Sequence, residues 1–336
     1  MPRAYQGSFI TKTPITPSGP YQCGAASGVW TIDQMVGWQK AGLWPTAGNA
    51  YGTVGIFALG GTPCPSTTRD KYTFSGCVVS SGAAASAASY YGSAAGNSTV
   101  GIFALGLNAS YISITTRDKY TYSGCINSSA TAASAASRLG AAAGNSTVGI
   151  FALGLISCTA STTRNKYTYS GDTNGTATAA SAASYLGSAA GNSTVGIFAL
   201  GNSTTTRNKY TYSGCVNASA TASSAASYAG SAAGNSTVGI FALGNVCGIG
   251  RSTTRNKYTY SGCTNGSATS ATTNSSYGSA AGNATVGIFA LGETPCASTT
   301  RNKYTYSGCV NASATASSAA SCAGSAASNG TTGVNV

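Results

Sequence analysis

Six copies of the hexapeptide Gly-Ile-Phe-Ala-Leu-Gly, spaced 43 to 48 residues apart, constrain the fold of this chain more than any other feature. A second string, Thr-Arg-Asp/Asn-Lys-Tyr-Thr-Tyr/Phe-Ser-Gly, follows each copy, and the length variation falls between the two strings, as in a surface loop. The hexapeptides begin at Gly55, Gly101, Gly149, Gly196, Gly239 and Gly287. Self-similarity at such a period predicts a solenoid, a propeller or an array of identical units.

Each repeat contains signals for four short strands. The sequence Gly96-Asn97-Ser98 is typical of a tight turn and predicts a hairpin between residues 93–95 and 99–105. Residues 119–122 alternate polar and aromatic side chains with the period of a half-buried strand, and the Ala/Ser-rich stretch 217–227 is the expected outermost strand. Four strands in about 47 residues are typical of a propeller blade.

The predicted fold class is therefore all-β, a propeller of six or seven four-stranded blades with a short non-repeating N-terminal segment. Seven hairpin signals occur when residues 47–59 and 325–336 are counted, but only six tyrosine-bearing strands. Seven blades would close if residues 8–13 completed the last one, and six blades would leave one hairpin spare; we favour seven. A parallel β-solenoid is the structural alternative, although its coils are usually shorter than this repeat. A disordered chain would lack the evenly recurring aromatic and apolar runs.

The order of the two strings resembles the kelch repeat, in which a strand ending in two glycines precedes a variable loop and a strand with spaced aromatic residues. The resemblance extends over residues 49–336 and implies a kelch-like β-propeller. Only Gly60-Gly61 keeps the double glycine, and no repeat contains the tryptophan usual in kelch blades. We therefore expect tyrosine and phenylalanine to pack between the blades.

Residues 1–48 do not repeat and form a Trp- and Pro-rich segment ahead of the repeat domain, residues 49–336. Residues 33–41 are predicted to form a short helix that Gly42 and Trp44-Pro45 end. The pattern SGVWTIDQ…GLWP resembles a segment of structural proteins of tailed bacteriophages, cyanophages among them, and implies an anchoring role. The candidate anchor residues are Trp30, Trp38 and Trp44. In the alternative interpretation, Trp30 and Trp44 plug one mouth of the propeller.

The chain contains no histidine and only five acidic residues, which excludes serine–histidine and cysteine–histidine nucleophiles and histidine metal sites. A carboxylate pair for glycoside hydrolysis would need two of these acids about 5–10 Å apart in one cleft. Asp70 and Asp118 occupy the same repeat position and would come this close only near the central axis. We therefore expect no enzyme activity, no cofactor and no metal.

Twelve of the 17 lysine and arginine residues recur as Arg-x-Lys in the six repeats. Residues i and i+2 of a strand point to the same face, so a closed propeller would carry a ring of cations. Such a ring would attract an anionic partner, for example an acidic glycan. In the alternative interpretation each arginine joins neighbouring blades and each lysine is solvated. The candidate residues are Arg69, Lys71, Arg117, Lys119, Arg164, Lys166, Arg207, Lys209, Arg255, Lys257, Arg301 and Lys303.

The eleven cysteines include no CxxC pair, so a zinc site has little support. Five of them directly follow the Ser-Gly of a repeat, at a position where the third repeat has Asp172. Cys64 and Cys77 flank an extended strand and would lie far beyond the roughly 7 Å that a disulfide allows between Cα atoms. We expect small buried thiols, while bridges between neighbouring blades or between subunits stay open.

These features predict a protein that binds a partner and displays a binding surface, and that does not catalyse a reaction. The N-terminus lacks the apolar segment of a secretory signal, and no run of 18 apolar residues occurs, so we expect neither secretory export nor membrane insertion. With the phage resemblance, this predicts a virion structural protein that is assembled in the host cytoplasm, anchored through residues 1–48 and associated with the tail, baseplate or a fibre.

The expected role of this virion protein is attachment to the host surface. Its expected partners are other virion proteins and anionic host-surface glycans, bound by a homo-oligomer or by several copies in a larger assembly, and no specific nucleic-acid sequence. The alternatives are a cytoplasmic kelch-type scaffold for a protein partner and a purely architectural part of the virion.

Overall fold

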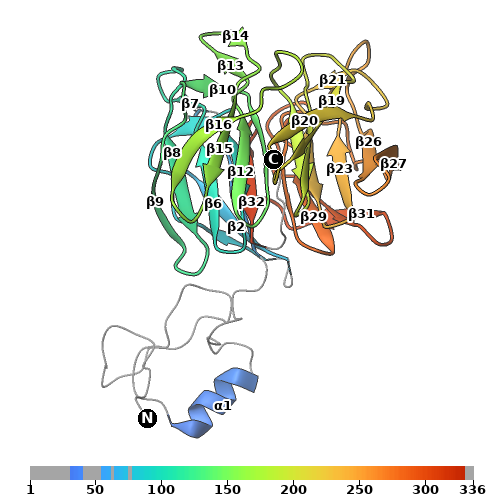
Figure 1. Cartoon of the computed structure of the whole chain (residues 1–336). Coiled ribbons are helices and arrows are strands. Elements are labelled where there is room, and N and C mark those ends of the chain that lie inside the picture. The colour runs from blue at the N-terminus through green and yellow to red at the C-terminus, as the bar shows by residue number, and fades with distance from the viewer. Residues whose placement is uncertain (1–30, 41–53, 62–63, 75–77, 330–336) are drawn as a thin grey trace. The chain divides into compact units, whose positions relative to one another are not determined.

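The structure, a computed structural model, describes residues 31–40, 54–61, 64–74 and 78–329. The chain divides into two compact units, residues 1–52 with 123–125, and residues 53–122 with 126–336. The second unit contains nearly all of the described residues and is built from β-strands (Figure 1). The prediction of an all-β repeat domain is therefore confirmed.

The described part of the first unit is the helix α1 (Ile32–Lys40), close to the predicted helix at residues 33–41. Thr31 Oγ1 accepts a hydrogen bond from the Gln34 N–H, and Gln34 Oε1 accepts one from the Thr31 N–H, which is the reciprocal capping box that favours a helix start. Trp38 lies in this helix. Trp30 and Trp44 lie outside the described residues, so the anchoring role of the three tryptophans stays a prediction.

Each repeat forms one four-stranded antiparallel sheet, as the second repeat shows. Its strands, in order across the sheet, are β5 (Ser93–Gly96), β6 (Val100–Ala104), β8 (Arg117–Thr121) and β9 (Ile126–Ala130). In the turn between β5 and β6, Asn97 Oδ1 accepts hydrogen bonds from the N–H groups of Thr99 and Val100, both at 2.9 Å. The predicted hairpin is confirmed, and asparagine stabilises its turn as this residue type does elsewhere.

The described residues contain six such sheets, and the strands fall into four classes by position. The first strands are β5, β11 (Ala141–Gly144), β17 (Ser188–Gly191), β22 (Ser231–Gly234), β28 (Ser279–Gly282) and β32 (Ser325–Ser328). The second strands are β1 (Val54–Ala58), β6, β12 (Val148–Ala152), β18 (Val195–Ala199), β23 (Val238–Ala242) and β29 (Val286–Ala290). The third strands are β2 (Arg69–Thr73), β8, β15 (Arg164–Thr168), β19 (Arg207–Thr211), β26 (Arg255–Thr259) and β30 (Arg301–Thr305). The fourth strands are β3 (Val78–Ser81), β9, β16 (Thr173–Ala177), β20 (Val216–Ala220), β27 (Thr264–Ala268) and β31 (Val310–Ala314).

The first sheet joins the two ends of the repeat region. Its order is β3-β2-β1-β32, and β1 pairs with β32 in a register that sets Gly55 opposite Ser328 and Ala58 opposite Ser325. The hairpin signals near residues 47–59 and 325–336 therefore contribute to one shared sheet and not to two. For this reason the described residues form six four-stranded sheets, where we favoured seven blades. Residues 8–13, which we expected to complete a seventh sheet, lie outside the described residues.

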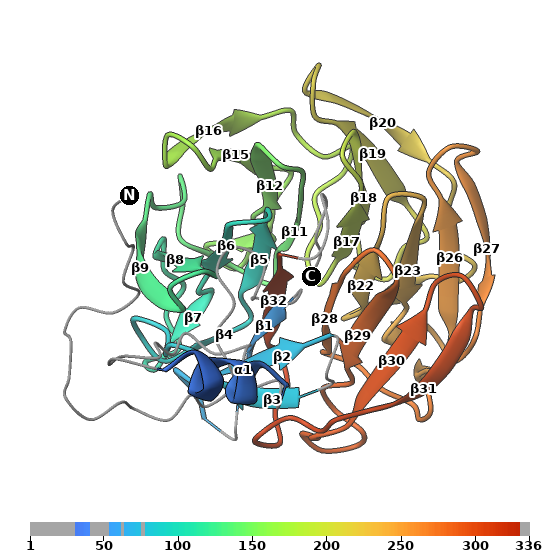
Figure 2. The same ribbon diagram turned by 90° about the horizontal axis from the view of Figure 1, so that it is seen from below.

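The first strands of neighbouring sheets contact one another in a closed cycle, β32–β5–β11–β17–β22–β28–β32. Figure 2 shows the sheets arranged radially around one axis, with the first strands innermost. This closed, antiparallel arrangement excludes the parallel solenoid. It also places the Gly-Ile-Phe-Ala-Leu-Gly strands second from the axis, directly outside the innermost strands.

Short strands in the variable loops lie at one end of the ring (Figure 1). They form small pairings between the segment that leads into each innermost strand and the following loop; Tyr90, for example, pairs with Leu107. These strands are β4 (Ser89–Tyr90), β7 (Leu107–Asn108), β10 (Ser137–Arg138), β13 (Leu155–Ile156), β14 (Thr159–Ala160), β21 (Ser227–Tyr228), β24 (Asn245–Val246) and β25 (Gly250–Arg251). We call this end the loop face.

The core lies between neighbouring sheets and consists of aliphatic, aromatic and alanine side chains. Between the fourth and fifth sheets, Ile197 packs with Phe241 and Tyr258, and all three are buried. The tyrosine of each third strand is fully buried in every repeat, as expected for a propeller without tryptophan in its blades. These tyrosines are Tyr72, Tyr120, Tyr167, Tyr210, Tyr258 and Tyr304.

Paired glycines on the two inner strands make room for a second aromatic residue. A Cβ atom on Gly149 would lie 2.8 Å from Tyr169 Oη and 3.2 Å from Ala95 Cβ of the neighbouring sheet. We expect Gly149→Ala to lower the free energy of unfolding by about 2–3 kcal/mol, because extra volume in a packed core forces displacement. Urea unfolding measures this loss.

Tyr169→Phe should relieve part of that loss in the double variant, because it removes the hydroxyl that the new methyl group meets. Phe74 already occupies the equivalent position of the first sheet, so Tyr169→Phe alone should change stability by less than about 1 kcal/mol. Strictly additive effects of the two substitutions would contradict the steric explanation.

Candidate functional site

The arginines of the six third strands join neighbouring sheets. Arg164 is representative: its Nη1 donates to Asn217 Oδ1 at 2.7 Å, and its Nη2 donates to Asn208 Oδ1 at 3.1 Å, both in the next sheet. The guanidinium carbon lies 4.5 Å from the centre of the Phe198 ring, a cation–π distance. We call this unit the arginine clasp.

The arginine clasps recur between neighbouring sheets around the ring, including between the last sheet and the first. Arg301 of the sixth sheet donates to Asp70 of the first at 2.9 Å, and Arg69 of the first donates to Asp118 of the second at 2.9 Å. Four sheets carry asparagine where these two carry aspartate. A serine of the preceding sheet adapts to this difference: Ser86 Oγ donates to Asp118, whereas Ser134 Oγ accepts from Asn165 Nδ2.

The arginines do not form the cationic ring that one interpretation predicted. All six are at most 1% exposed, because the clasp encloses each guanidinium between two sheets. Burial lowers the pKa of Arg117, Arg164, Arg207 and Arg255 to about 10, so they stay protonated at neutral pH. The alternative interpretation, in which each arginine joins neighbouring blades, agrees with this placement.

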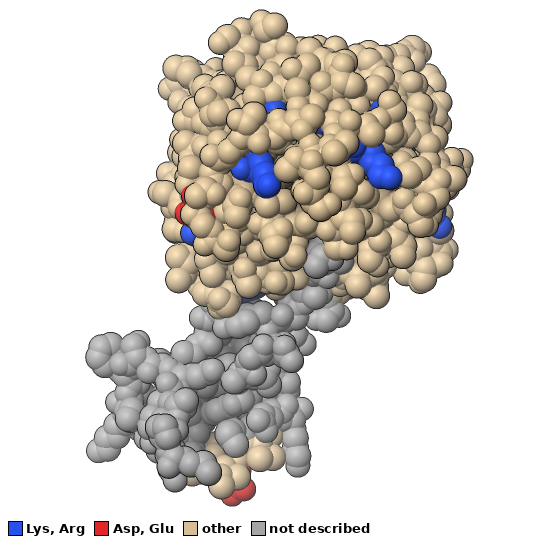
Figure 3. All heavy atoms as spheres, in the orientation of Figure 1, with Lys and Arg blue, Asp and Glu red and all other residues tan. Residues whose placement is uncertain are grey.

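The lysines of the Arg-x-Lys pairs are also less exposed than expected. Lys71 is buried, and Lys119, Lys166, Lys209, Lys257 and Lys303 are partly buried. Lys119 forms an ion pair with Asp172 at 3.1 Å, and three others contact cysteine sulfurs of the next sheet. On the face that Figure 3 displays, the basic side chains are isolated and do not form a band.

The cysteines differ from the expected set of buried thiols. Cys64, Cys158, Cys247 and Cys296 are exposed, and Cys215, Cys263, Cys309 and Cys322 are partly exposed. These eight thiols are free, whereas Cys125 is disulfide-bonded. Cys23 and Cys77 lie outside the described residues.

A ring of six residues surrounds the axis at the loop face. Each is the residue directly before the glycine that precedes an innermost strand. The N–H of each residue donates to the carbonyl oxygen of its counterpart in the neighbouring sheet, at 2.8–3.0 Å, until the sixth bond closes the ring. We call these residues the axial ring: Tyr91, Leu139, Leu186, Ala229, Tyr277 and Ala323.

All six residues of the axial ring have left-handed backbones, with φ between 53° and 58°. Only glycine adopts this conformation without a penalty of about 1–2 kcal/mol per residue. The ring of hydrogen bonds explains the conformation but not the side chains. The positions carry tyrosine, leucine or alanine although glycine would suit the backbone better.

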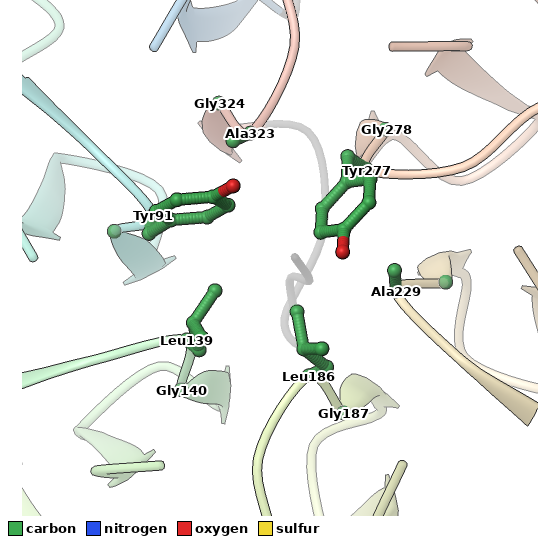
Figure 4. A pocket seen from close by; sticks show the side chains of 12 residues that line it. Tyr91, Leu139, Gly140, Leu186, Gly187, Ala229, Tyr277, Gly278, Ala323 and Gly324 are labelled. Carbon is green, nitrogen blue, oxygen red and sulfur yellow. The ribbon is translucent and has the colours of Figure 1, made fainter. Parts of the chain in front are cut away.

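The axial ring lines a hollow that opens at the loop face. Figure 4 shows Tyr91, Tyr277, Leu139 and Leu186 extending toward the same central space. The volume of the hollow is about 40 Å³, which is enough for a few water molecules but not for a buried sugar unit. A larger ligand would therefore lie across the mouth of the hollow.

Four tyrosines extend from the hollow into a neighbouring loop. Tyr91 lies 6.0 Å from Tyr277 and 4.4 Å from Tyr90 between ring centres, and Tyr90 lies 5.8 Å from Tyr111. Burial raises the pKa of Tyr91 to about 12, and it also raises the pKa values of Tyr90 and Tyr277, so these rings stay neutral. We call Tyr111, Tyr90, Tyr91 and Tyr277 the aromatic row.

The loops around the aromatic row carry exposed apolar residues and a few charges. Tyr111 is 63% exposed, Ile112 61% and Ile249 77%. Arg251 forms an ion pair with Glu293 at 2.7 Å, and Arg138 donates to Ser113 Oγ at 3.0 Å. Tyr111 and Ile112 are adjacent and form a small exposed apolar surface, and Ile249 lies in another loop.

The acidic residues of the described sheets and loops all serve ion pairs. Asp70 and Asp118 lie inside arginine clasps, Asp172 pairs with Lys119, and Glu293 pairs with Arg251. Within the part of the chain that the structure describes, no group of three or more cysteine, aspartate or glutamate residues could hold a metal ion. No helix in that part is long and apolar enough to cross a membrane.

Sequence reasoning missed the axial ring, although a signal for it exists. The repeats are nearly identical around the inner strands, yet the residue before Gly-Ser/Ala-Ala-Ala varies among tyrosine, leucine and alanine. Variation at one position of otherwise uniform repeats indicates that the side chain there differs in its contacts from repeat to repeat. The loops between the two repeat strings vary as well, and they lie at the same end of the ring.

Comparison with known proteins supports the fold and nothing finer. No protein-family model matches the chain, and neither does any curated protein. Among solved structures, one titled "Structure of YjhT" resembles the chain with a TM-score of 0.54 at 10% sequence identity. The similarity covers 71% of this chain and 87% of that one. At such low identity the likeness concerns the architecture alone.

Proposed function

We propose that this chain is a non-enzymatic binding and display protein, built on a six-bladed, kelch-like β-propeller whose loop face contacts the partner. The observation that carries this proposal is the axial ring. Its side chains differ between otherwise near-identical repeats, and they occupy left-handed backbones that favour glycine. The arginine clasps supply the rigid framework that holds side chains from six repeats around one axis.

The partner class that suits the loop face best is a surface glycan with acidic substituents. Neutral tyrosine rings present flat apolar faces that stack on sugar rings, and their hydroxyl groups hydrogen-bond to sugar hydroxyls. Arg138 belongs to β10 and Arg251 to β25, two of the short strands of the loop face, and guanidinium groups bind carboxylates or phosphates in two-point geometry. The cationic contribution thus comes from these loop arginines and not from the Arg-x-Lys pairs.

The biological setting that we propose is the virion of a tailed bacteriophage, with residues 1–48 as anchor and the propeller as the host-attachment part of a tail, baseplate or fibre. The support is the resemblance of SGVWTIDQ…GLWP to phage structural proteins. Mass spectrometry of purified particles, with the full chain and with residues 1–48 deleted, tests this setting. Normal incorporation of the shortened chain would contradict the anchor role.

Binding of the full chain to immobilised bacterial surface polysaccharides tests the role of the loop face. We expect Tyr91→Ala and Tyr277→Ala to weaken binding at least tenfold, because central aromatic residues dominate most interfaces. Tyr185→Ala is the matched control, since Tyr185 precedes an axial residue as Tyr90 does but lies outside the aromatic row. Its effect should stay below about threefold.

Two outcomes would redirect the proposal. Binding that is unchanged in both tyrosine variants would remove the loop face from the function. Absence of glycan binding, together with stable capture of a protein partner through Ile112 and Ile249, would favour the scaffold role.

A further inference from the structure

Three cysteines at the outer part of the sheets each face a lysine of the preceding sheet. Each follows the Ser-Gly of its repeat and is partly exposed. The Nζ–Sγ distances are 3.5 Å for Lys166–Cys215, 3.4 Å for Lys209–Cys263 and 3.5 Å for Lys257–Cys309. We call them the lysine–cysteine pairs. The fold builds the same contact three times, so it belongs to the repeat itself.

The third repeat carries an anion at this position, whereas Cys125 occupies it in the second repeat as a disulfide. The third repeat has Asp172 in place of cysteine, and the carboxylate forms an ion pair with Lys119 of the preceding sheet. The surroundings match as well: the Thr131 hydroxyl donates to the carbonyl oxygen of Asp172 as the Thr178 hydroxyl does to that of Cys215. An anion fills this position where the side chain is aspartate, and a thiolate is the anionic form that cysteine can supply.

A lysine and a tyrosine are the titratable groups that face each of these sulfurs. The tyrosines are Tyr210 beside Cys215, Tyr258 beside Cys263 and Tyr304 beside Cys309. The hydroxyl of Tyr304 and the ammonium group of Lys257 lower the pKa of the Cys309 thiol, since both stabilise the thiolate. A partly exposed sulfur beside a cation is the environment in which cysteines become reactive.

We propose that Cys215, Cys263 and Cys309, each beside a lysine ammonium group, form a set of modification sites for peroxides and other small, soft electrophiles. In the reaction with hydrogen peroxide the thiolate sulfur attacks one peroxide oxygen, so that an S–O bond forms and the O–O bond breaks. Hydroxide leaves and takes a proton from the paired lysine ammonium to become water. The products are a sulfenic acid, an uncharged lysine and water; the sulfur is oxidised and the peroxide is reduced.

Trapping of sulfenic acid with a dione probe, followed by peptide mass spectrometry on the folded full chain, tests this proposal. At neutral pH and low peroxide, we expect the probe at Cys215, Cys263 and Cys309 ahead of the more exposed Cys247 and Cys296. Lys209→Met should slow labelling of Cys263 about tenfold and leave that of Cys309 unchanged, because the fraction of thiolate falls when its cation is removed. Lys209→Arg should retain the reactivity.

A pH series separates thiolate character from simple accessibility. For each cysteine, the iodoacetamide alkylation rate at pH 6.5 is divided by its rate at pH 9, so that differences in exposure cancel. The ratio should be several-fold higher for the lysine–cysteine pairs than for Cys247 and Cys296. Equal ratios, or labelling of Cys263 that Lys209→Met does not slow, would overturn the proposal.

Discussion

Replacing Arg164 with alanine is expected to lower the free energy of unfolding by about 3 kcal/mol. The substitution removes two hydrogen bonds from a charged donor to the next sheet and leaves Asn208 and Asn217 without these partners. It also opens a cavity beside Phe198, which packs against the guanidinium. Urea unfolding monitored by circular dichroism measures the loss.

Two matched variants separate the contributions to this effect. Arg164→Met keeps most of the buried volume but not the donors, so it should recover only a minor part of the loss. Asp118→Asn should lower the free energy of unfolding by only about 1 kcal/mol, because asparagine accepts the same hydrogen bond in four other clasps. A methionine variant as stable as the native protein would show that the clasp contributes packing alone.

Removing residues 325–336 is expected to abolish the cooperative folding of the repeat domain. The deletion takes away β32, so that β1 loses its inner partner and keeps only β2, while β5 and β28 lose the neighbour that closes the ring. Ala326 and Ala327 are fully buried, so the surface that the deletion exposes to water is part of the hydrophobic core. Thermal unfolding followed by near-ultraviolet circular dichroism should show no sharp transition.

A rearranged chain provides the control for this deletion. When residues 325–331 are fused directly before Val54, the junction reads SAASNGT-VGIFALG, which reproduces the SAAGNST-VGIFALG hairpin of the other repeats. This chain should fold cooperatively although its ends have moved. A truncated chain that keeps a native-like transition would show that β32 is not needed to close the sheets.

The repeat pattern predicted the strands well because each strand carries its own local signal. The Gly-Asn turn, the apolar strand and the tyrosine-bearing strand all occur where residues 93–122 place them. The number of sheets was harder to predict, since the two outermost hairpin signals look complete in the sequence. Only the pairing of β1 with β32, across almost the whole repeat region, shows that they share one sheet.

The role of the arginines could not be decided from spacing alone. An identical Arg-x-Lys in every repeat fits both a charged surface and a repeated internal contact. The deciding partners, such as Asn208 and Asn217 for Arg164, belong to the next repeat and are uncharged. Charge counting overlooks such partners, which is why the expected surface ring proved to be mostly an internal framework.

The sequence did not predict the axial ring at the loop face, for a related reason. Its most informative property is the left-handed backbone of residues such as Tyr91 and Leu139, and no sequence rule places leucine or tyrosine there. The hydrogen bonds around the axis create this conformation only after the six sheets have closed. The functional proposal therefore depends on that closure, which gathers side chains from all six repeats into one site.

The most direct test of closure is a disulfide between the two ends of the ring. Ala58 and Ser325 lie opposite each other on β1 and β32. The Asn329 N–H donates to the Val54 carbonyl oxygen at the other end of the same ladder, so the alternation of an antiparallel ladder makes Ala58–Ser325 a hydrogen-bonded pair, with Cα atoms about 5.5 Å apart. This distance lies within the range that a disulfide allows between Cα atoms. Ala58→Cys with Ser325→Cys should cross-link spontaneously in the folded chain, as detected by peptide mass spectrometry without reduction.

The matched control is Ala58→Cys with Ser279→Cys. Ser279 holds the same position as Ser325, but in the neighbouring sheet, where it pairs with Ala290. A closed ring of six sheets predicts a nearly complete bond between positions 58 and 325 and almost none between 58 and 279. Failure of the first pair to cross-link in a folded chain, or equal cross-linking of both pairs, would contradict the closed ring.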